Sequence, residues 1–231
     1  MKKRSKRFKI IEKKKIKEKI SLDKIFDLIK DNCTSKFNES IDVSVKINTK
    51  QSKGGDYSLR TITKLPNGNG KKIRIAVLSE QEKVDEAKKS GAEVFGSEDL
   101  IQNISNGKLD FDKLICTPGM MGKIGKYGKI LGPKGLMPNP KLGTVNENVE
   151  KAIKDAKSGQ VEIRNDKDGN IGLTIGKKSF SDENLIKNYN AVIDTLEKEK
   201  SNNTVKGNLI KSSFITSSMG VSYKLKLNKS I

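Results

Sequence analysis

The sequence predicts an α+β protein of two domains, in which a discontinuous antiparallel α+β domain made from both ends of the chain flanks an inserted α/β domain. Both ends contain short stretches where apolar and polar residues alternate with a period of two, which is typical of half-buried antiparallel strands. The middle alternates short apolar runs with helical patterns, which favours a parallel sheet. Charge divides the chain in the same way: residues 1–67 and 160–231 together carry 31 basic and 16 acidic residues, whereas residues 68–159 carry 16 and 12. We take these ranges as the predicted domains.

The first 19 residues form a basic segment with eleven lysines and arginines against two glutamates. A segment with so few apolar residues is expected to be a solvated or disordered arm. Such an arm would condense onto phosphate groups once a polyanionic partner is present.

The N-terminal part of the terminal domain is expected to contain one helix and two strands. Ser21 is a suitable N-cap, and apolar residues then recur at helical spacing over 22–29. Residues 41–47 alternate apolar and polar side chains without a break, which predicts a half-buried strand. A second strand is expected over 57–65, and the Pro-Asn-Gly-Asn-Gly run at 66–70 predicts a turn at the domain boundary.

The middle of the chain is expected to fold as a small parallel sheet covered by helices, because its strands are apolar runs without alternation. The expected elements, in order, are a strand over 73–78, a helix ending at Gly91, a strand over 93–95, a helix over 97–107, a strand over 111–117 and a helix over 147–158. Gly159 follows this last helix in the C-cap position.

The C-terminal part returns to the period of two. Strands are expected over 160–165 and 170–176, joined as a hairpin by the turn at 166–169. A helix over 181–200 and two further strands, over 207–217 and 221–227, complete the terminal domain. The inward face of that helix is expected to carry Leu185, Tyr189, Val192, Ile193 and Leu196.

Composition excludes several classes of function. A formal net charge of +19 indicates a polyanionic partner, since such a chain otherwise repels itself. The absence of histidine removes catalysis and zinc binding through imidazole. Cys33 and Cys116 are isolated, so they are expected to be small buried residues in a reducing compartment. No apolar run reaches membrane length, and the start does not resemble a signal peptide. We expect a cytoplasmic protein with no metal, no cofactor and no membrane partner.

The most unusual stretch, residues 117–144, is rich in glycine and proline and carries lysines but no acidic residue. Such a segment can present backbone N–H groups and cationic tips to phosphate, or it can be a rigid connection, and both can hold. No Gly-Lys pair is followed by Ser or Thr, which disfavours a P-loop NTPase. Gly68-Asn69-Gly70 precedes a strand rather than a helix, so the dinucleotide fingerprint fails. The four-residue Gly-x-x-Gly loop of KH domains occurs twice but is too common to decide anything.

Two spots in the terminal segments are candidate RNA contacts. Phe37, beside Lys36 in the connection from helix to strand, could stack on a base while the lysine holds a phosphate; the alternative is that it closes the core. Thr216 to Gly220 interrupts two strands with three hydroxyls, a thioether and a glycine, which lets RNA approach the backbone closely. The alternative there is an ordinary bulge or turn.

On these residues the chain resembles the bacterial type of the large-subunit ribosomal protein L-one family, found in the mobile side stalk of the ribosome. The resemblance is closest over Gly132-Pro-Lys-Gly-Leu-Met-Pro-Asn-Pro-Lys141 followed by Gly143-Thr-Val145, and it spans roughly residues 5 to 222. The runs at 36–40 and 164–167 and Ser217-Ser-Met-Gly220 occur in the expected order. The family usually has two threonines where Ser217 and Ser218 stand, so the hydroxyls are kept and some rigidity is lost.

The resemblance implies that the inserted domain is Rossmann-like and that the terminal domain binds large-subunit rRNA. It further implies a role in release of deacylated tRNA from the exit site, repression of translation through the leader of the protein's own mRNA, and a monomer outside the ribosome. Carried over by position, the implied RNA contacts are Lys36, Phe37, Glu39, Ser40, Asp166, Ser212, Ser218, Met219 and Gly220.

Two other classes of function stay open. One is a nucleic-acid-acting enzyme, for which Asp110 and Asp112 are the nearest approach to paired carboxylates in the insert. The other is a nonspecific basic RNA chaperone, which the net charge alone would also fit. The favoured interpretation is a structural rRNA-binding protein of the large subunit that is not an enzyme.

Overall fold

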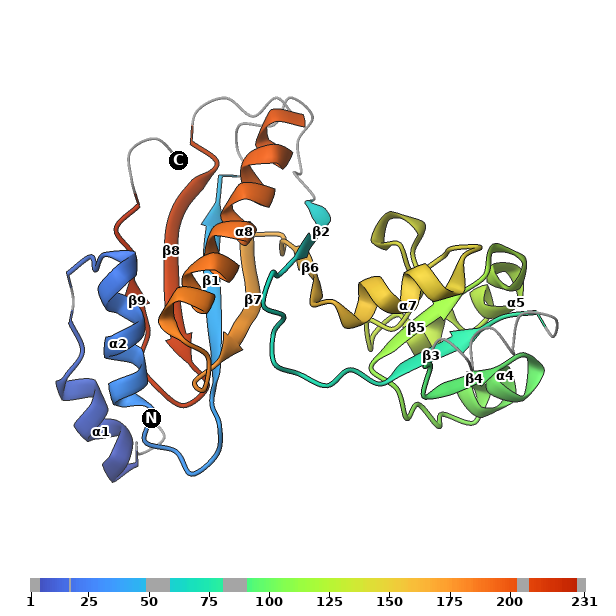
Figure 1. Cartoon of the computed structure of the whole chain (residues 1–231), viewed down its shortest axis with the longest axis horizontal. Coiled ribbons are helices and arrows are strands. Elements are labelled where there is room, and N and C mark those ends of the chain that lie inside the picture. Colours follow the sequence, from blue (N-terminus) through green and yellow to red (C-terminus); the bar gives the residue numbers. More distant parts are fainter. Residues whose placement is uncertain (1–4, 17, 49–58, 81–90, 203–207, 228–231) are drawn as a thin grey trace. The chain divides into compact units, whose positions relative to one another are not determined.

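A computed structural model describes residues 5–16, 18–48, 59–80, 91–202 and 208–227 (Figure 1). The chain divides into two units, one formed by residues 1–70 with 161–231 and the other by residues 71–160. We call them the terminal unit and the inserted unit. Most of the helix expected before Gly91, the start of the strand expected from residue 57 and residue 207 lie outside the described residues.

The terminal unit is built on a four-stranded antiparallel sheet whose strand order is β7-β1-β8-β9. The strands are β1 (Ser40–Ile47), β7 (Asn170–Lys177), β8 (Ile210–Ser217) and β9 (Tyr223–Lys224). Val43 lies opposite Leu173 of β7 on one side and opposite Ile215 of β8 on the other. The alternating strand predicted over 41–47 is therefore confirmed, and it is an inner strand bonded along both edges.

One face of this sheet is covered by two helices, α2 (Leu22–Asn32) and α8 (Asp182–Asn202) (Figure 1). The predicted helix after Ser21 is confirmed, with Ser21 as its N-cap. The buried residues beneath the helices include Ile41, Val43, Val45 and Ile47 of β1 and all five side chains predicted to face inward from α8. Each such aliphatic side chain stabilises the fold by roughly 1.5–3 kcal/mol on leaving water.

The opposite face of the same sheet stays partly exposed, and we call it the open sheet face. It carries the even-numbered positions of the two inner strands, which alternate with the buried ones. Its members are Asp42, Ser44 and Lys46 of β1, Gly172 and Thr174 of β7, and Ser212, Phe214 and Thr216 of β8. A polar antiparallel face of this kind is free to bind a partner.

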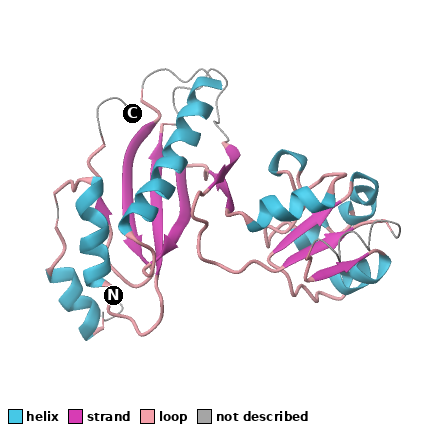
Figure 2. Ribbon diagram, viewed as in Figure 1, coloured by secondary structure: helices cyan, strands magenta, loops and turns pink. Residues whose placement is uncertain are grey.

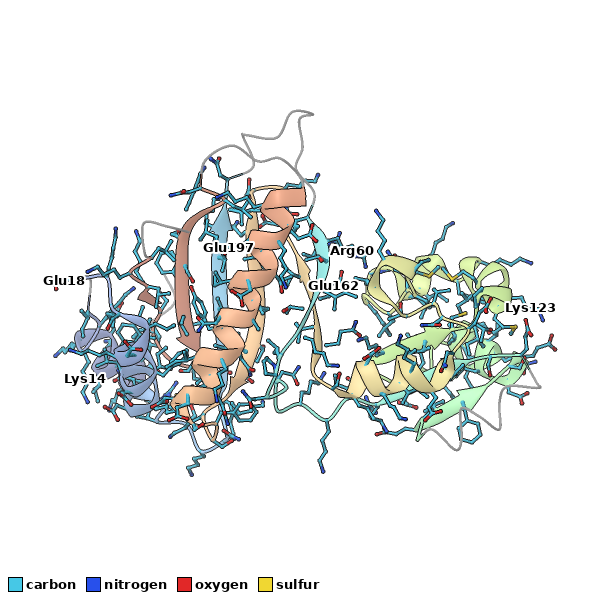
Figure 3. All side chains as sticks on the ribbon, turned by 45° about the horizontal axis from the view of Figure 1, so that its top comes forward. Lys14, Glu18, Arg60, Lys123, Glu162 and Glu197 are labelled. Atoms are coloured by element: carbon cyan, nitrogen blue, oxygen red, sulfur yellow. The ribbon has the colours of Figure 1, made fainter. Side chains whose placement is uncertain are left out.

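The hairpin predicted between residues 160–165 and 170–176 is wrong. Strand β6 (Gln160–Arg164) pairs instead with β2 (Arg60–Lys64) in a separate two-stranded sheet. Arg60 Nε lies 2.7 Å from Glu162 Oε1 across that pair, and the two side chains meet in Figure 3. Strand β7 pairs with β1 along one edge, and between β6 and β7 the described residues show a single antiparallel bridge, from Asn165 to Ile171. Alternation with a period of two predicts which side chains of a strand share a face, but it does not predict which strand pairs with it.

The basic N-terminal segment, expected to be a solvated or disordered arm, is mostly exposed over residues 5–16 but contains a helix. Helix α1 (Lys6–Lys13) begins after Ser5, whose hydroxyl accepts a hydrogen bond from the Phe8 N–H at 3.2 Å. Ile11 is 3 % exposed and joins the core of the terminal unit, with Phe8 packed at its edge. Two apolar side chains three positions apart thus hold the helix against the core, while its exposed positions are mostly charged.

The inserted unit contains a three-stranded parallel sheet of order β4-β3-β5, which confirms the predicted parallel arrangement. Its strands are β3 (Ile75–Leu78), β4 (Val94–Gly96) and β5 (Lys113–Cys116). Among its described residues the helices are α4 (Glu98–Ser105), η2 (Pro118–Met120), α5 (Met121–Gly125), α6 (Gly128–Leu131), η3 (Pro140–Leu142) and α7 (Val149–Lys157). Figure 2 shows helices, coloured cyan, beside the strands of this sheet.

Both faces of this sheet are buried. In β3, Ala76 and Leu78 belong to an apolar cluster with α4 and α5, whereas Ile75 and Val77 belong to a second cluster with α7. A strand covered on both faces has no polar face left to alternate with, which explains its unbroken apolar sequence.

Both cysteines behave as predicted, since Cys33 and Cys116 are free and buried. Burial raises the pKa of the Cys116 thiol to about 12. Among the described residues, no helix combines the length and the apolar character that a membrane span requires.

Candidate nucleic-acid interface

Two segments from opposite ends of the chain meet at one edge of the terminal unit. The Met219 N–H donates to Glu39 Oε2 at 3.0 Å, and the Ser218 N–H donates to the Ser40 carbonyl at 3.0 Å. The Ser218 hydroxyl also accepts from the Ser40 N–H at 3.1 Å, between residues 178 positions apart in sequence. The structure therefore brings the loop before β1 and the loop after β8 together.

Glu39 joins these loops from the inside. Its side chain is fully buried and accepts hydrogen bonds from the Met219 N–H and, at 3.2 Å, from the Ser35 N–H. Burial pushes the pKa of this carboxyl up, but hydrogen bonds from Met219, Ser217 and Ser35 outweigh it and hold the pKa below its ordinary value. Glu39 is therefore a buried carboxylate bound to protein, and in this arrangement it positions the contact loops rather than offering its own side chain to RNA.

The outer surface of the two loops exposes large apolar side chains beside a lysine. Phe37 is 54 % exposed and Met219 is 48 % exposed, while Lys36 and Ser218 are also exposed. We call Lys36, Phe37, Ser218, Met219 and Gly220 the two-loop surface. The alternative in which Phe37 closes the core does not hold. An exposed ring next to cationic and hydroxyl groups suits a nucleotide, which offers a π-face and a phosphate.

Gly220 is packed too closely to accept a side chain. A Cβ at this position would collide with the Ser217 hydroxyl oxygen, and the Gly220 N–H donates to the Ser217 carbonyl at 3.2 Å in a tight turn. The Ser217 hydroxyl also supports the ionised Glu39. Any side chain at Gly220 would therefore disturb the network that joins the two loops.

Asp166 and Ser212 lie away from the two-loop surface, toward the other end of β1. Ser212 is opposite Lys46, six residues along the strand from Ser40, which corresponds to about 20 Å. Asp166 is exposed in the turn before β7, where its carboxylate accepts from the Asn170 N–H at 2.6 Å and from Asn170 Nδ2 at 2.9 Å. These bonds lower the pKa of Asp166. The open sheet face lies between the two-loop surface and the end of β1 near which Ser212 and Asp166 lie.

The residue that sequence reasoning missed on this face is Phe214. It lies opposite Ser44, between Ser212 and Thr216, and Lys224 Nζ lies 5.8 Å from the centroid of its ring. This is a cation–π distance. The alternation of β8 contains the signal, because Phe214 shares the parity of Ser212 and Thr216 and stands opposite to the buried Ser213 and Ile215.

The Gly/Pro/Lys-rich segment of the inserted unit folds against β5. Thr144 accepts from the Asn139 N–H at 2.7 Å, and its carbonyl accepts from the Cys116 N–H at 2.9 Å. Gly143 has a φ of +65°, a conformation that glycine adopts without strain. The segment is therefore a rigid connection, and it also keeps exposed Lys123, Lys126, Lys129, Lys134 and Lys141.

The carboxylates considered for an enzyme do not form an acid–base pair. Asp112 accepts from the Arg74 N–H at 3.2 Å and lies 3.2 Å from Lys71 Nζ, and these groups lower its pKa. Asp110 is exposed. A carboxylate so stabilised in its charged form is poorly suited to donate a proton at neutral pH. Within the described ranges, no group of three or more acidic or cysteine side chains could hold a metal ion.

Comparison with known proteins finds a family model and several relatives that cover most of the chain. Residues 29–221 match the model of the ribosomal protein L1p/L10e family. The chain is 58 % identical over 228 residues to the large ribosomal subunit protein uL1 of Pelagibacter ubique (strain HTCC1062), covering 98 % of this chain and 99 % of that one. It is 46 % identical over 202 residues to uL1 of Prochlorococcus marinus (strain NATL1A), covering 87 % and 85 %. It is 43 % identical over 229 residues to uL1c of Arabidopsis thaliana, covering 99 % and 66 %.

Proposed function

The chain belongs to the ribosomal protein L1p/L10e family, and from that membership we propose how it binds the rRNA of the large ribosomal subunit. The proposed RNA-binding domain is formed by residues 1–67 and 160–231, and residues 68–159 form a Rossmann-like insert. The proposal gives the protein a structural, non-enzymatic role in the ribosome of the cytoplasm, as a monomer before assembly. The alternatives were a nonspecific RNA chaperone and an enzyme.

The observation that carries the proposal is the junction of the two loops. The hydrogen bond between Ser40 and Ser218, 178 positions apart in sequence, brings the two loops together at one edge of the terminal unit. The loops carry an exposed phenylalanine, an exposed methionine and a lysine, and buried Glu39 bonds to the backbone of the second loop. A surface assembled from such distant segments has a fixed shape only when the whole unit is folded. Fixed shape is what distinguishes recognition of a folded RNA from general attraction to phosphate.

We assign two kinds of contribution to the interface. Lysines such as Lys36 and Lys46 supply an attraction to phosphate that weakens with salt. Phe37 and the turn at Met219-Gly220 supply shape, by stacking and by close approach of the backbone. Ser40 and Ser218 present oxygen atoms at the two loops, and Ser212 and Asp166 present oxygen atoms toward the other end of β1, for hydrogen bonds to 2′-OH groups. Glu39 contributes by positioning the loops.

A double substitution tests this assignment. Phe37→Ala with Gly220→Val removes the stacking ring and distorts the turn, and should weaken binding of an rRNA fragment by more than about 2 kcal/mol in a filter-binding titration. Phe95→Ala is the matched control, because it removes a ring that is 37 % exposed in the inserted unit. Unchanged affinity of the double variant, with its circular dichroism spectrum preserved, would reject the site.

A competition titration separates the proposal from a nonspecific chaperone. At physiological salt, unrelated RNA of equal length should displace the rRNA fragment only in large excess, because shape contributes as well as charge. Equal competition by unrelated RNA would favour the chaperone. Turnover of RNA or nucleotides in the presence of magnesium would favour the enzyme.

We further propose that the insert takes part in release of deacylated tRNA from the exit site. The five exposed lysines of residues 123–141 lie in a stretch without any acidic residue, and they suit a polyanion such as tRNA. Replacing these lysines by glutamine should slow tRNA release from purified ribosomes while leaving rRNA-fragment binding intact. Unaltered release would remove this role.

Repression of the protein's own message is proposed through the same RNA surface. A reporter that carries the leader of the protein's own mRNA should fall when the protein is overproduced, and Phe37→Ala with Gly220→Val should abolish the fall. A reporter that does not respond to the wild-type protein would contradict the proposal.

A further inference from the structure

A cavity of about 420 Å³ lies between helix α1 and the turn at Met219-Gly220. Its lining residues are Ser5, Arg7, Phe8, Ser218, Met219 and Gly220. Small-molecule sites usually enclose roughly 300–1,000 Å³, so this volume suffices for a single small ligand. The cavity adjoins the two-loop surface, and half of its lining belongs to the N-terminal segment, which the two-loop surface does not include.

Arg7 forms a wall of the cavity and is held in place on three sides. Its guanidinium donates to the Thr34 hydroxyl at 3.0 Å, to the Ser35 hydroxyl at 3.2 Å and to the Met219 carbonyl at 3.1 Å. A guanidinium has five N–H donors, so these bonds to described residues leave two for a ligand. An arginine whose planar group is already oriented is well suited to bind phosphate.

The remaining walls combine apolar and hydroxyl surfaces. Phe8 is half-buried at the edge of the core, and the Met219 side chain is 48 % exposed. Ser5 and Ser218 contribute hydroxyl oxygens, and none of the lining residues is a carboxylate. A ligand that satisfies this lining has a flat apolar face, hydroxyl groups and a negative charge. A nucleotide has all three.

We propose that this cavity binds one unpaired nucleotide of the RNA, with its base against Phe8 and Met219 and its phosphate on Arg7. The proposal rests on the proposed function, since it extends the same RNA interface onto α1. The N-terminal helix thereby becomes a part of the binding site, and Arg7 acts both on the ligand and on the loops that it joins.

Methyl NMR with nucleoside monophosphates tests the cavity without any rRNA. The methyl group of Met219 should shift in a saturable manner on addition of a monophosphate, while those of Met120, Met121 and Met137 in the inserted unit should not. Inorganic phosphate at the same concentration should leave Met219 unshifted. No shift, or an equal shift with inorganic phosphate, would overturn the proposal.

A substitution pair on α1 tests the same cavity with the rRNA fragment. Phe8→Leu keeps an apolar side chain against the core but removes the stacking face, and should weaken binding about tenfold. Ile10→Ala is the matched control, because Ile10 is 61 % exposed on the same helix and does not line the cavity. Provided that the wild-type protein binds the rRNA fragment, two outcomes would refute nucleotide binding in the cavity. One is an equal loss of affinity in both variants, and the other is an unchanged affinity of Phe8→Leu. A Met219 shift with mononucleotides but no rRNA binding by the wild-type protein would instead refute the proposed function.

Discussion

The two main sheets of this protein bury their strands in different ways. The parallel sheet of the inserted unit has apolar clusters on both faces, and its central strand β3 is buried throughout. The antiparallel sheet of the terminal unit has helices α2 and α8 on one face and a polar face on the other. The difference shows where binding can take place: in the inserted unit apolar clusters cover both faces of the sheet, whereas in the terminal unit one face of the sheet itself offers a surface.

The largest effect that separates the two sheets is expected from Ile115→Ala. Ile115 in β5 is 1 % exposed, and its truncation should cost the inserted unit about 2–5 kcal/mol of stability. Amide hydrogen exchange of β3 and β5 should speed up accordingly, while affinity for the rRNA fragment stays unchanged. If Ile115→Ala also lowered the affinity for the rRNA fragment, the covered sheet of the inserted unit would be shown to support binding.

Glu39→Gln should lower the free energy of unfolding of the terminal unit by about 1–3 kcal/mol, because hydrogen bonds to a buried charged group are lost. Thermal unfolding at neutral pH measures the loss, and the affinity for RNA should fall with it. Asp110→Asn, an exposed substitution in the inserted unit, is the matched control. An unchanged melting temperature of Glu39→Gln would contradict the positioning role.

The same carboxyl predicts a pH dependence. Because the pKa of Glu39 is lowered in the folded state, its stabilising contribution is present above the ordinary pKa of 4.5 and is lost as the pH falls through the lower, folded value. The stability difference between the wild-type protein and Glu39→Gln should therefore shrink below pH 4.5. A difference that stays constant from neutral pH down to pH 3 would show that folding does not lower the pKa of Glu39.

Phe214→Leu tests whether the open sheet face takes part in binding. The substitution keeps an apolar side chain on β8, so it should change stability by less than about 1.5 kcal/mol. It should weaken rRNA-fragment binding about tenfold, the effect of one lost stacking contact. Filter binding measures the effect, and equal affinity of the variant would confine the interface to the two-loop surface.

The smallest expected effect is on salt dependence. Lys46→Ala on the open sheet face should reduce the slope of log K against log salt by about 0.7–0.9, the contribution of one phosphate contact. Lys123→Ala, on α5 of the inserted unit, should leave the slope for the rRNA fragment unchanged. If Lys46→Ala and Lys123→Ala gave equal salt slopes, the assignment of the rRNA phosphate contacts to the terminal unit alone would be contradicted.

Much of the fold could be predicted from the sequence because its two patterns differ. The alternation over 41–47 identified β1 and its buried face, and the unbroken apolar run over 75–78 identified a covered strand. The partner of β6 could not be predicted, since β2 lies about a hundred residues earlier and pairing depends on tertiary packing. Helix α1 was missed because its lysines mask the two apolar side chains that hold it.

The candidate site was predictable only in part. Motif resemblance identified both loops of the two-loop surface, and the structure brings them together. The burial of Glu39 could not be predicted, because its hydrogen-bond donors come from residues that are distant in sequence. In the sequence, Arg7 is one of eleven basic residues in the first 19 and nothing distinguishes it from the others. Its contact with both loops is visible only in the structure, where it donates to Ser35 and Met219. Sequence therefore indicated the candidate contact residues but not the residues that hold them in place.

The order of strands also governs when the protein can act during its own synthesis. Strand β1 is made early, yet both of its lateral partners, β7 and β8, come from the last third of the chain. At translation rates of about 5–20 residues per second, the 178 residues between Ser40 and Ser218 take roughly 9–36 s to make. The inserted unit can fold in that interval, but β1 waits unpaired until the C-terminal strands emerge. A nascent chain therefore lacks the junction of the two loops, on which the proposed recognition of RNA shape depends, until its synthesis is nearly complete.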